Sequence, residues 1–162
     1  MHYPRNPLVS VVMAVYNEER FIGQAIRSIL GQTYSNLELI IVNDGSTDGT
    51  SEIIQKYCND NRVRSLKHST NLGVSKALNN GIERGKGVFI ARMDADDVSL
   101  PRRIEYQVGY LIDHENIGLL GTGAVIIDEA DRRLLKIIKF LVFNLFWTGL
   151  CMFCKLAPLL LS

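Results

Sequence analysis

The sequence has almost no excess of charge, because 18 lysine and arginine residues stand against 17 aspartate and glutamate residues and leave a formal net charge of +1. No global field therefore attracts a nucleic acid, and we expect any polyanionic ligand to be recognised at a local site. Cysteine is also scarce. Three cysteines, an odd number, argue against a disulfide framework and indicate a reducing compartment, so we expect a cytoplasmic protein.

Acidic residues are absent after Asp131, and residues 140–154 carry no charge at all. A transmembrane helix needs about twenty apolar residues, so this stretch is short for a span and favours a buried or membrane-surface segment. Residues 134–162 are therefore interpreted as an apolar tail, through which the protein could associate with the inner face of the membrane.

Hydrophobic residues make up 47% of the 162 residues, which is enough for one domain with a sizeable core. Short β-branched apolar runs alternate with stretches whose apolar residues recur at helical spacing, and this alternation predicts an α/β domain with a mostly parallel sheet. Glu18 and Glu19 are expected to open the first helix, because acids favour the first helical turn. We expect strands at 8–15, 37–42, 63–66, 88–91 and 117–127, and helices at 18–30, around 53–57, at 75–82 and at 101–112.

Polar side chains follow three of the expected strands directly: Asn17, Asp44 and the cluster at residues 94–97. Ligands of open α/β sheets bind beyond the carboxyl ends of the strands, so these three stretches should meet at one edge. Asp94, Asp96 and Asp97 repel one another unless a cation or hydrogen-bond donors offset their charge. Hard oxygen ligands favour Mg²⁺ or Mn²⁺, which complete their coordination with water and substrate phosphates.

Two structural alternatives remain open for these acids. Asp97 or Ser99 could cap the helix that starts near Pro101, although a cap needs one side chain and not three. Asp44 could belong to an ordinary Asp-Gly turn. Arg92, beside the cluster, could meet a sugar or phosphate, or could be an exposed arginine at a strand end.

Four segments, in this order, resemble the donor-site motifs of the family 2 glycosyltransferases of the GT-A type. They are residues 9–19, VSVVMAVYNEE; residues 43–50, NDGSTDGT; residues 71–79, NLGVSKALN; and residues 93–97, MDADD. Four ordered motifs are more specific than any one of them.

The resemblance implies an inverting enzyme with a GT-A, Rossmann-like fold that binds a nucleotide diphosphate sugar, most often a UDP-sugar. It also implies a saccharide or lipid-linked acceptor, in the synthesis of a cell-surface polysaccharide or glycoconjugate. The roles implied by position are base and ribose contacts from Tyr16, Asn17, Glu18 and Asp44, a ribose or sugar contact from Asp94, and a divalent cation, Mn²⁺ or Mg²⁺, held on the diphosphate by Asp96.

A general base is the missing part. Inverting transfer needs one for the acceptor hydroxyl, and in the resembled family it is a carboxylate well downstream of the Asp-x-Asp motif. Asp128 and Glu129 come too early, and we interpret them as solvated surface. We therefore expect residues 1–133 to form an incomplete, apparently truncated GT-A domain, and leave the catalytic residues unassigned.

Other functions also remain open. The chain could bind a nucleotide sugar without transferring it, because the acceptor half and the base are not visible. A receiver-type phosphoacceptor domain is disfavoured because Tyr16 and Asn17, and not acids, follow the first strand. A dinucleotide-binding domain is disfavoured because no Gly-x-Gly-x-x-Gly motif follows that strand.

Overall fold

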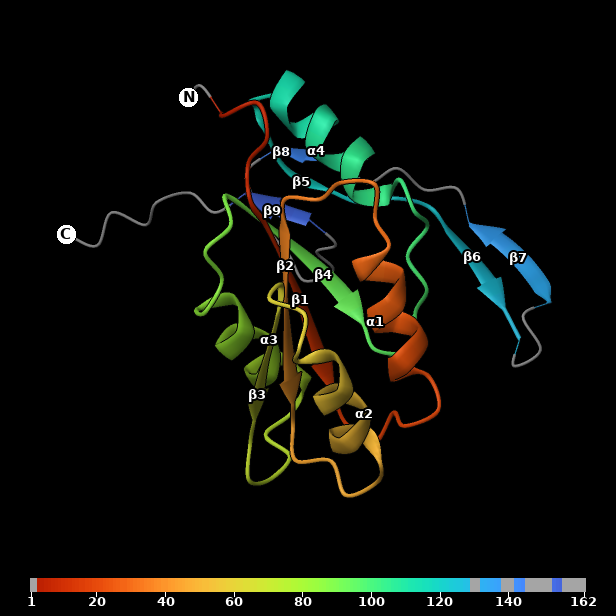
Figure 1. Ribbon diagram of the computed structural model, residues 1–162. Coiled ribbons are helices and arrows are strands. Elements are labelled where there is room, and N and C mark those ends of the chain that lie inside the picture. The colour runs from red at the N-terminus through yellow and green to blue at the C-terminus, as the bar shows by residue number, and fades with distance from the viewer. Residues whose placement is uncertain (1–2, 129–131, 138–141, 145–152, 156–162) are drawn as a thin grey trace.

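The computed structural model describes residues 3–128, 132–137, 142–144 and 153–155, in which helices cover both faces of a central sheet (Figure 1). The first eight elements alternate between strand and helix, as expected. They are β1 (Val9–Val15), α1 (Ile22–Leu30), β2 (Leu37–Asn43), α2 (Thr50–Tyr57), β3 (Val63–Lys67), α3 (Val74–Ile82), β4 (Phe89–Asp94) and α4 (Arg103–Asp113). Five strands follow: β5 (Ile117–Leu120), β6 (Ala124–Ile127), β7 (Arg133–Ile137), β8 (Val142–Asn144) and β9 (Phe153–Lys155).

The main sheet has the strand order β3-β2-β1-β4-β9-β5-β8. Neighbouring strands among β1 to β4 are parallel, while β9 pairs antiparallel with β4 and β5, and β8 antiparallel with β5. The expected α/β architecture is confirmed, and its parallel part is the four-stranded unit β3-β2-β1-β4. A helix connects each pair of consecutive parallel strands, as parallel pairing requires.

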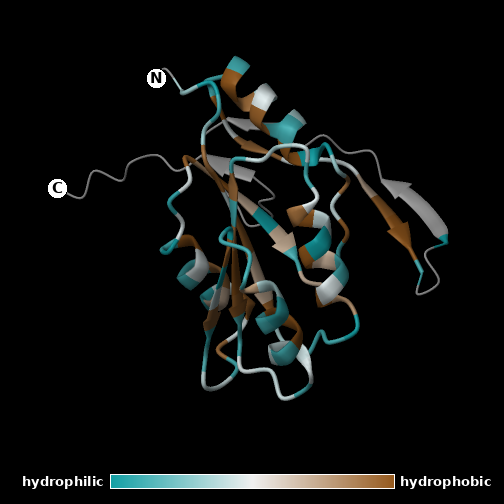
Figure 2. Cartoon of the chain, viewed as in Figure 1, coloured by the Kyte–Doolittle hydropathy of each residue, from teal (hydrophilic) through white to brown (hydrophobic). Residues whose placement is uncertain are grey.

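Buried apolar residues explain why these segments adopt their structures. Every residue of β2 is buried and all but one of β1, as expected for strands covered on both faces. One core cluster joins one face of the sheet to α1, α2 and α4, and a smaller one joins Ile40 and Val42 to Ala77 of α3. Figure 2 shows mainly apolar residues along the central strands, while polar and apolar residues alternate along the helices.

Three expected boundaries are wrong. Helix α1 begins at Ile22, so Glu18 and Glu19 precede it and no acid lies in its first turn. Strand β4 runs on through Asp94, so the acidic cluster begins inside the strand. The expected strand at 117–127 is two strands, because residues 121–123 break it and β6 pairs with β7 in a separate sheet.

Most of the apolar tail at 134–162 lies outside the described residues. Its described backbone contributes the end of β7 and all of β8 and β9. Within the described ranges, no helix has both the length and the apolar character needed to cross a bilayer.

Candidate functional site

The carboxyl ends of β1, β2 and β4 lie next to one another. In the parallel register Val15 of β1 pairs with Asn43 of β2, and Ala14 of β1 pairs with Asp94 of β4. The residues that follow these strands therefore meet at one edge of the sheet, as the sequence predicts.

The loop after β1 is tied to the loop after β2 through Asn17. Its side-chain oxygen accepts a hydrogen bond of 2.9 Å from the Thr47 amide, and its own amide donates to the Ser46 hydroxyl at 3.0 Å. Asn17 has a φ of 55°. Asparagine is among the few residues that tolerate this left-handed conformation, so the sequence is matched to the turn.

Glu18 and Glu19, which do not start the helix, extend this connection. The Glu18 amide donates to the Thr50 hydroxyl at 2.9 Å, and a Glu19 carboxylate oxygen accepts from the Gly49 amide at 2.7 Å. The Glu19 amide donates to the Asp48 carboxylate at 3.2 Å. Local helix propensity is overridden here because the acids serve a contact between loops about thirty residues apart.

The Asp44 carboxylate points into the protein. Its Oδ1 lies 2.6 Å from His68 Nδ1 and accepts from the Leu72 amide at 3.0 Å, and its Oδ2 accepts from the Gly73 amide at 2.8 Å. Burial alone would raise the pKa of Asp44, but these three bonds outweigh it and hold the pKa below its ordinary value. Asp44 is thus ionised and joins the end of β2 to the segment after β3. The interpretation as a simple turn residue is insufficient.

The acidic cluster combines one paired acid with two exposed acids. Arg92 binds the Asp94 carboxylate at 2.9 Å, so Arg92 is paired and not simply an exposed arginine. Asp96 and Asp97 are exposed. The pKa of Asp97 is raised by partial removal from water and then by the charges of Asp94 and Asp96, against the opposing effect of Arg103 and Arg92.

Helix capping does not account for these acids. The residue that precedes α4 is Arg102, and no side chain caps the helix there. Ser99 is buried and instead accepts a bond of 3.1 Å from Gln32 Nε2. Pro101 lies in the turn before α4 and not in its first turn.

Glu18 brings a further carboxylate to this edge. Its pKa is raised by burial first and then by the negative charges of Asp96 and Asp48, so the turn after β1 and the cluster after β4 share one electrostatic environment. Tyr16, beside it, exposes 44% of its surface. This edge of the sheet thus combines the exposed ring of Tyr16 with the carboxylates of Glu18 and Asp96.

The donor set at this edge suits a hard divalent cation. Among the described residues, no group of three or more His, Cys, Asp or Glu side chains is arranged as a complete metal cage. Asp96, with Glu18 near it, offers carboxylate oxygens only. Mg²⁺ and Mn²⁺ bind in this manner where one or two carboxylates share the ion with phosphates.

Two residues near the site escaped the sequence analysis. His68 at the end of β3 contacts Asp44, and the half-buried Arg103 of α4 donates to the Arg92 carbonyl at 2.8 Å and senses the charges of Asp97 and Asp94. A signal for His68 did exist, because the residue that directly follows β3 lies beside the end of β2 in a parallel sheet. Arg103 has no comparable signal.

Known proteins share the sequence and the fold of this chain. The model of the family described as "Glycosyl transferase family 2" matches residues 10–156. EpsE of Bacillus subtilis, which is named as a glycosyltransferase, is 41% identical over 134 residues, covering 82% of this chain and 48% of EpsE. The chain spans less than half the length of the first curated relatives that it matches.

Two solved structures share the fold. S. aureus TarS, residues 1–349, in complex with UDP-GlcNAc matches with a TM-score of 0.65 and 26% identity over 70% of this chain and 34% of that one. The mannosyltransferase PcManGT from Pyrobaculum calidifontis, in complex with GDP-Man and Mn²⁺, matches with a TM-score of 0.64 and 25% identity over 77% of this chain and 37% of that one.

Proposed function

The chain belongs to glycosyl transferase family 2, and we propose that its sheet edge binds the nucleotide diphosphate part of a sugar donor together with Mn²⁺ or Mg²⁺. The fold is GT-A-like, as the motifs predict. The observation that carries the proposal is the meeting of the loops after β1, β2 and β4, at which the Glu18 carboxylate senses the charge of Asp96.

The proposed roles follow from exposure and contacts. Tyr16 offers an exposed ring for the base, and Asn17 and Glu18 belong to the turn that carries it. Asp44 has one lone pair left beyond its three contacts, and in this proposal that lone pair accepts from the base or ribose. Asp94, half-exposed beside Arg92, would meet the ribose or sugar.

The metal role is assigned to Asp96. Its carboxylate is exposed and lies where Glu18 adds negative charge, so this edge attracts a cation before any phosphate arrives. A bound divalent cation would neutralise the charge that develops on a diphosphate leaving group. The complex of PcManGT with GDP-Man and Mn²⁺ supports this assignment by similarity.

Sugar transfer is the finer part of the proposal. The donor is proposed to be a UDP-sugar, because the related TarS binds UDP-GlcNAc, and the acceptor a saccharide or lipid-linked molecule of cell-surface glycan synthesis. The apolar tail is proposed to keep the protein at the inner face of the membrane.

The deciding experiment is calorimetry with UDP, GDP and TDP, each with and without Mn²⁺. We expect one nucleotide to bind, roughly tenfold or more tightly with Mn²⁺, which corresponds to about 1.4 kcal/mol. Asp96→Ala should abolish this metal dependence, while Asp113→Ala, an exposed acid at the end of α4, should keep it. Equal affinities of the wild type and Asp96→Ala with metal present would remove Asp96 from the site.

Nucleotide-sugar binding without transfer is the second candidate. It is favoured because the described acid furthest along the chain, Asp128, is held by Arg132 at 2.7 Å. Sugar release from UDP-GlcNAc with candidate acceptors separates the two functions. Robust transfer by the purified 162-residue chain would reject the binding-only function.

A further inference from the structure

His68 connects the inner side of the site to helix α3. Its backbone amide donates to the Asn43 carbonyl at 2.9 Å, which fixes the residue beside the end of β2. The ring then reaches two partners: Nδ1 lies 2.6 Å from Asp44 Oδ1, and Nε2 lies 2.9 Å from Asn80 Nδ2. The side chain of His68 is only 13% exposed, and that of Asp44 only 4%.

The carboxylate of Asp44 determines which ring nitrogen of His68 carries a proton. An ionised carboxylate only accepts, so Nδ1 must carry the proton and donate to Asp44. Nε2, on the other side of the ring, faces the side-chain amide group of Asn80. Both ring nitrogens therefore have partners, and the two contacts hold the plane of the ring.

Asp44 in turn binds the segment after β3. Its two oxygens accept the amides of Leu72 and Gly73, and Asn71 Oδ1 accepts the Gly73 amide at 2.9 Å as well. Gly73 has a φ of 91°, one of many conformations open to glycine, so the bonds to Asp44 and Asn71 select it. Removing the support of Asp44 would therefore release the turn that leads into α3.

We propose that His68 and Asn80 are positioning residues that hold Asp44, and through it residues 71–73, in the shape that the donor nucleotide binds. The inference rests on the proposed function, because it assigns a purpose to a network at the nucleotide edge. Neither residue needs to touch the nucleotide. Their effect is exerted through the direction of the Asp44 carboxylate and the path of three residues of backbone.

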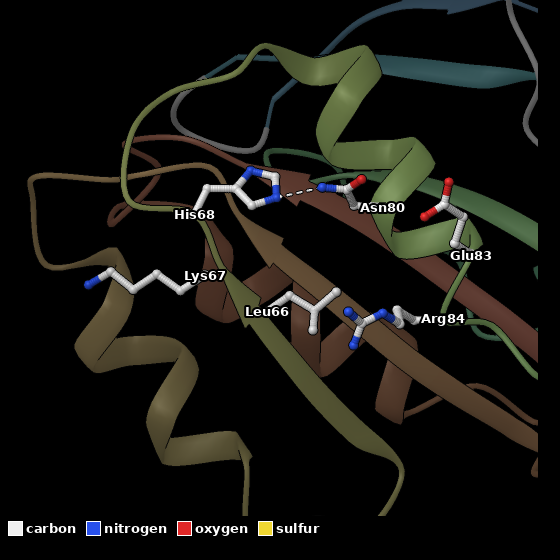
Figure 3. A pocket seen from close by; sticks show the side chains of 6 residues that line it. All are labelled: Leu66, Lys67, His68, Asn80, Glu83 and Arg84. Atoms are coloured by element: carbon white, nitrogen blue, oxygen red, sulfur yellow. Dashed lines mark hydrogen bonds between the residues drawn. The ribbon is translucent and has the colours of Figure 1, made fainter.

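The outer side of the pair is open to solvent. A hollow of about 250 Å³ is lined by Leu66, Lys67, His68, Asn80, Glu83 and Arg84, and Figure 3 shows the side chains of His68 and Asn80 pointing toward each other and joined by their hydrogen bond. A small molecule can therefore reach the place of the ring. If a substitution removes the ring, imidazole added to the solution can therefore take its place.

The test uses His68→Gly and added imidazole. We expect His68→Gly to bind UDP with Mn²⁺ roughly tenfold more weakly than the wild type, because small displacements of binding groups are costly. Imidazole should restore the affinity of His68→Gly and leave that of the wild type unchanged. Asn80→Ala should show a smaller loss, and Gln55→Ala, an exposed amide side chain on α2 and outside the donor-site motifs, none.

A second readout keeps the inference separate from the proposed function. Hydrogen exchange of the Leu72 and Gly73 amides should be faster in His68→Gly with no nucleotide present, and slow again with imidazole. If the wild type binds no nucleotide, the proposed function fails. If exchange at these two amides and UDP affinity are both unchanged in folded His68→Gly, the positioning role is overturned. If the glycine variant does not fold, His68→Leu, which fills part of the space of the ring but offers no donor to Asp44, gives the same comparison.

Discussion

A Cβ atom on Gly45 would lie 2.6 Å from the carbonyl carbon of Thr70, so the loops after β2 and β3 touch through their backbones. Gly45 also has a φ of 77°, a backbone conformation that residues other than glycine rarely adopt. Loop contact and backbone conformation therefore both require glycine at this position.

Gly45→Ala should destabilise the fold by more than the roughly 1–2 kcal/mol of a left-handed alanine, because the backbone of residue 70 must also move. Chemical denaturation measures the change. Gly109→Ala is the control, since a Cβ there meets nothing within 4 Å, and we expect it to stabilise by about 0.5–1 kcal/mol in an exposed helix. Equal stability of Gly45→Ala and the wild type would contradict the contact.

Asn17 should tolerate glycine better than alanine. Asn17→Gly loses the bond to the Thr47 amide but keeps the left-handed turn, whereas Asn17→Ala loses both and should be about 1 kcal/mol less stable than the glycine variant. Thermal unfolding of the two variants measures the difference. The opposite order would mean that the backbone of residue 17 is not constrained.

Glu18→Gln should weaken Mn²⁺ binding by roughly three- to tenfold, because a nearby carboxylate attracts the cation that Asp96 is proposed to hold. Burial and the charges of Asp96 and Asp48 raise the pKa of Glu18, so Mn²⁺ affinity of the wild type should rise as pH increases through that raised pKa. Electron paramagnetic resonance of free Mn²⁺ measures both effects.

Glu52→Gln, an exposed change on α2, is the matched control for Glu18→Gln and should leave Mn²⁺ affinity unchanged. Identical Mn²⁺ affinities for the two variants would place Glu18 outside the cation's reach.

Glu38 should make stability depend on pH at the acid end. Burial alone would raise its pKa, but bonds from the Ser10 hydroxyl at 2.6 Å, the Lys86 amide at 2.7 Å and Arg64 at 3.3 Å hold the pKa below its ordinary value. A lowered folded pKa stabilises the fold above the pKa of the unfolded chain, and this stability is lost as pH falls through the folded pKa.

Glu38→Gln should therefore cost about 1–3 kcal/mol at pH 7, and the difference in stability from the wild type should narrow as pH falls through the lowered pKa of Glu38. Urea unfolding at a series of pH values measures this difference. Glu83→Gln, an exposed acid, should show no such trend. A difference in unfolding free energy that does not change with pH would show that the charge of Glu38 does not contribute to stability.

The elements of the parallel unit were predictable because each buries a recognisable pattern. β1 and β2 are nearly continuous apolar runs, and α1 presents Ile22, Ala25, Ile26 and Ile29 to the core at helical spacing. The meeting of the loops after β1, β2 and β4 was predictable too. Helical connections make the strands parallel, and parallel strands end at the same edge.

Contacts between distant loops were not predictable. Glu18 and Glu19 have the composition of a first helical turn, yet their amides and the Glu19 carboxylate bond to residues 48–50. His68 binds Asp44 across 24 residues of chain, and only the register of β2 and β3 brings them together. The break at residues 121–123 depends on which sheet pairs with each half, which an apolar pattern cannot specify.

The strand order β3-β2-β1-β4 also has a kinetic consequence. β1 pairs with β4, which is formed from residues 89–94 and is therefore distant from β1 in sequence. The edge forms only after the long segment between these two strands has closed into a loop. Pairings of such separation make folding slow. The edge is incomplete until β1, β2 and β4 have paired, so a nucleotide bound there would recognise only a chain in which these strands are paired and would shift the folding equilibrium toward it.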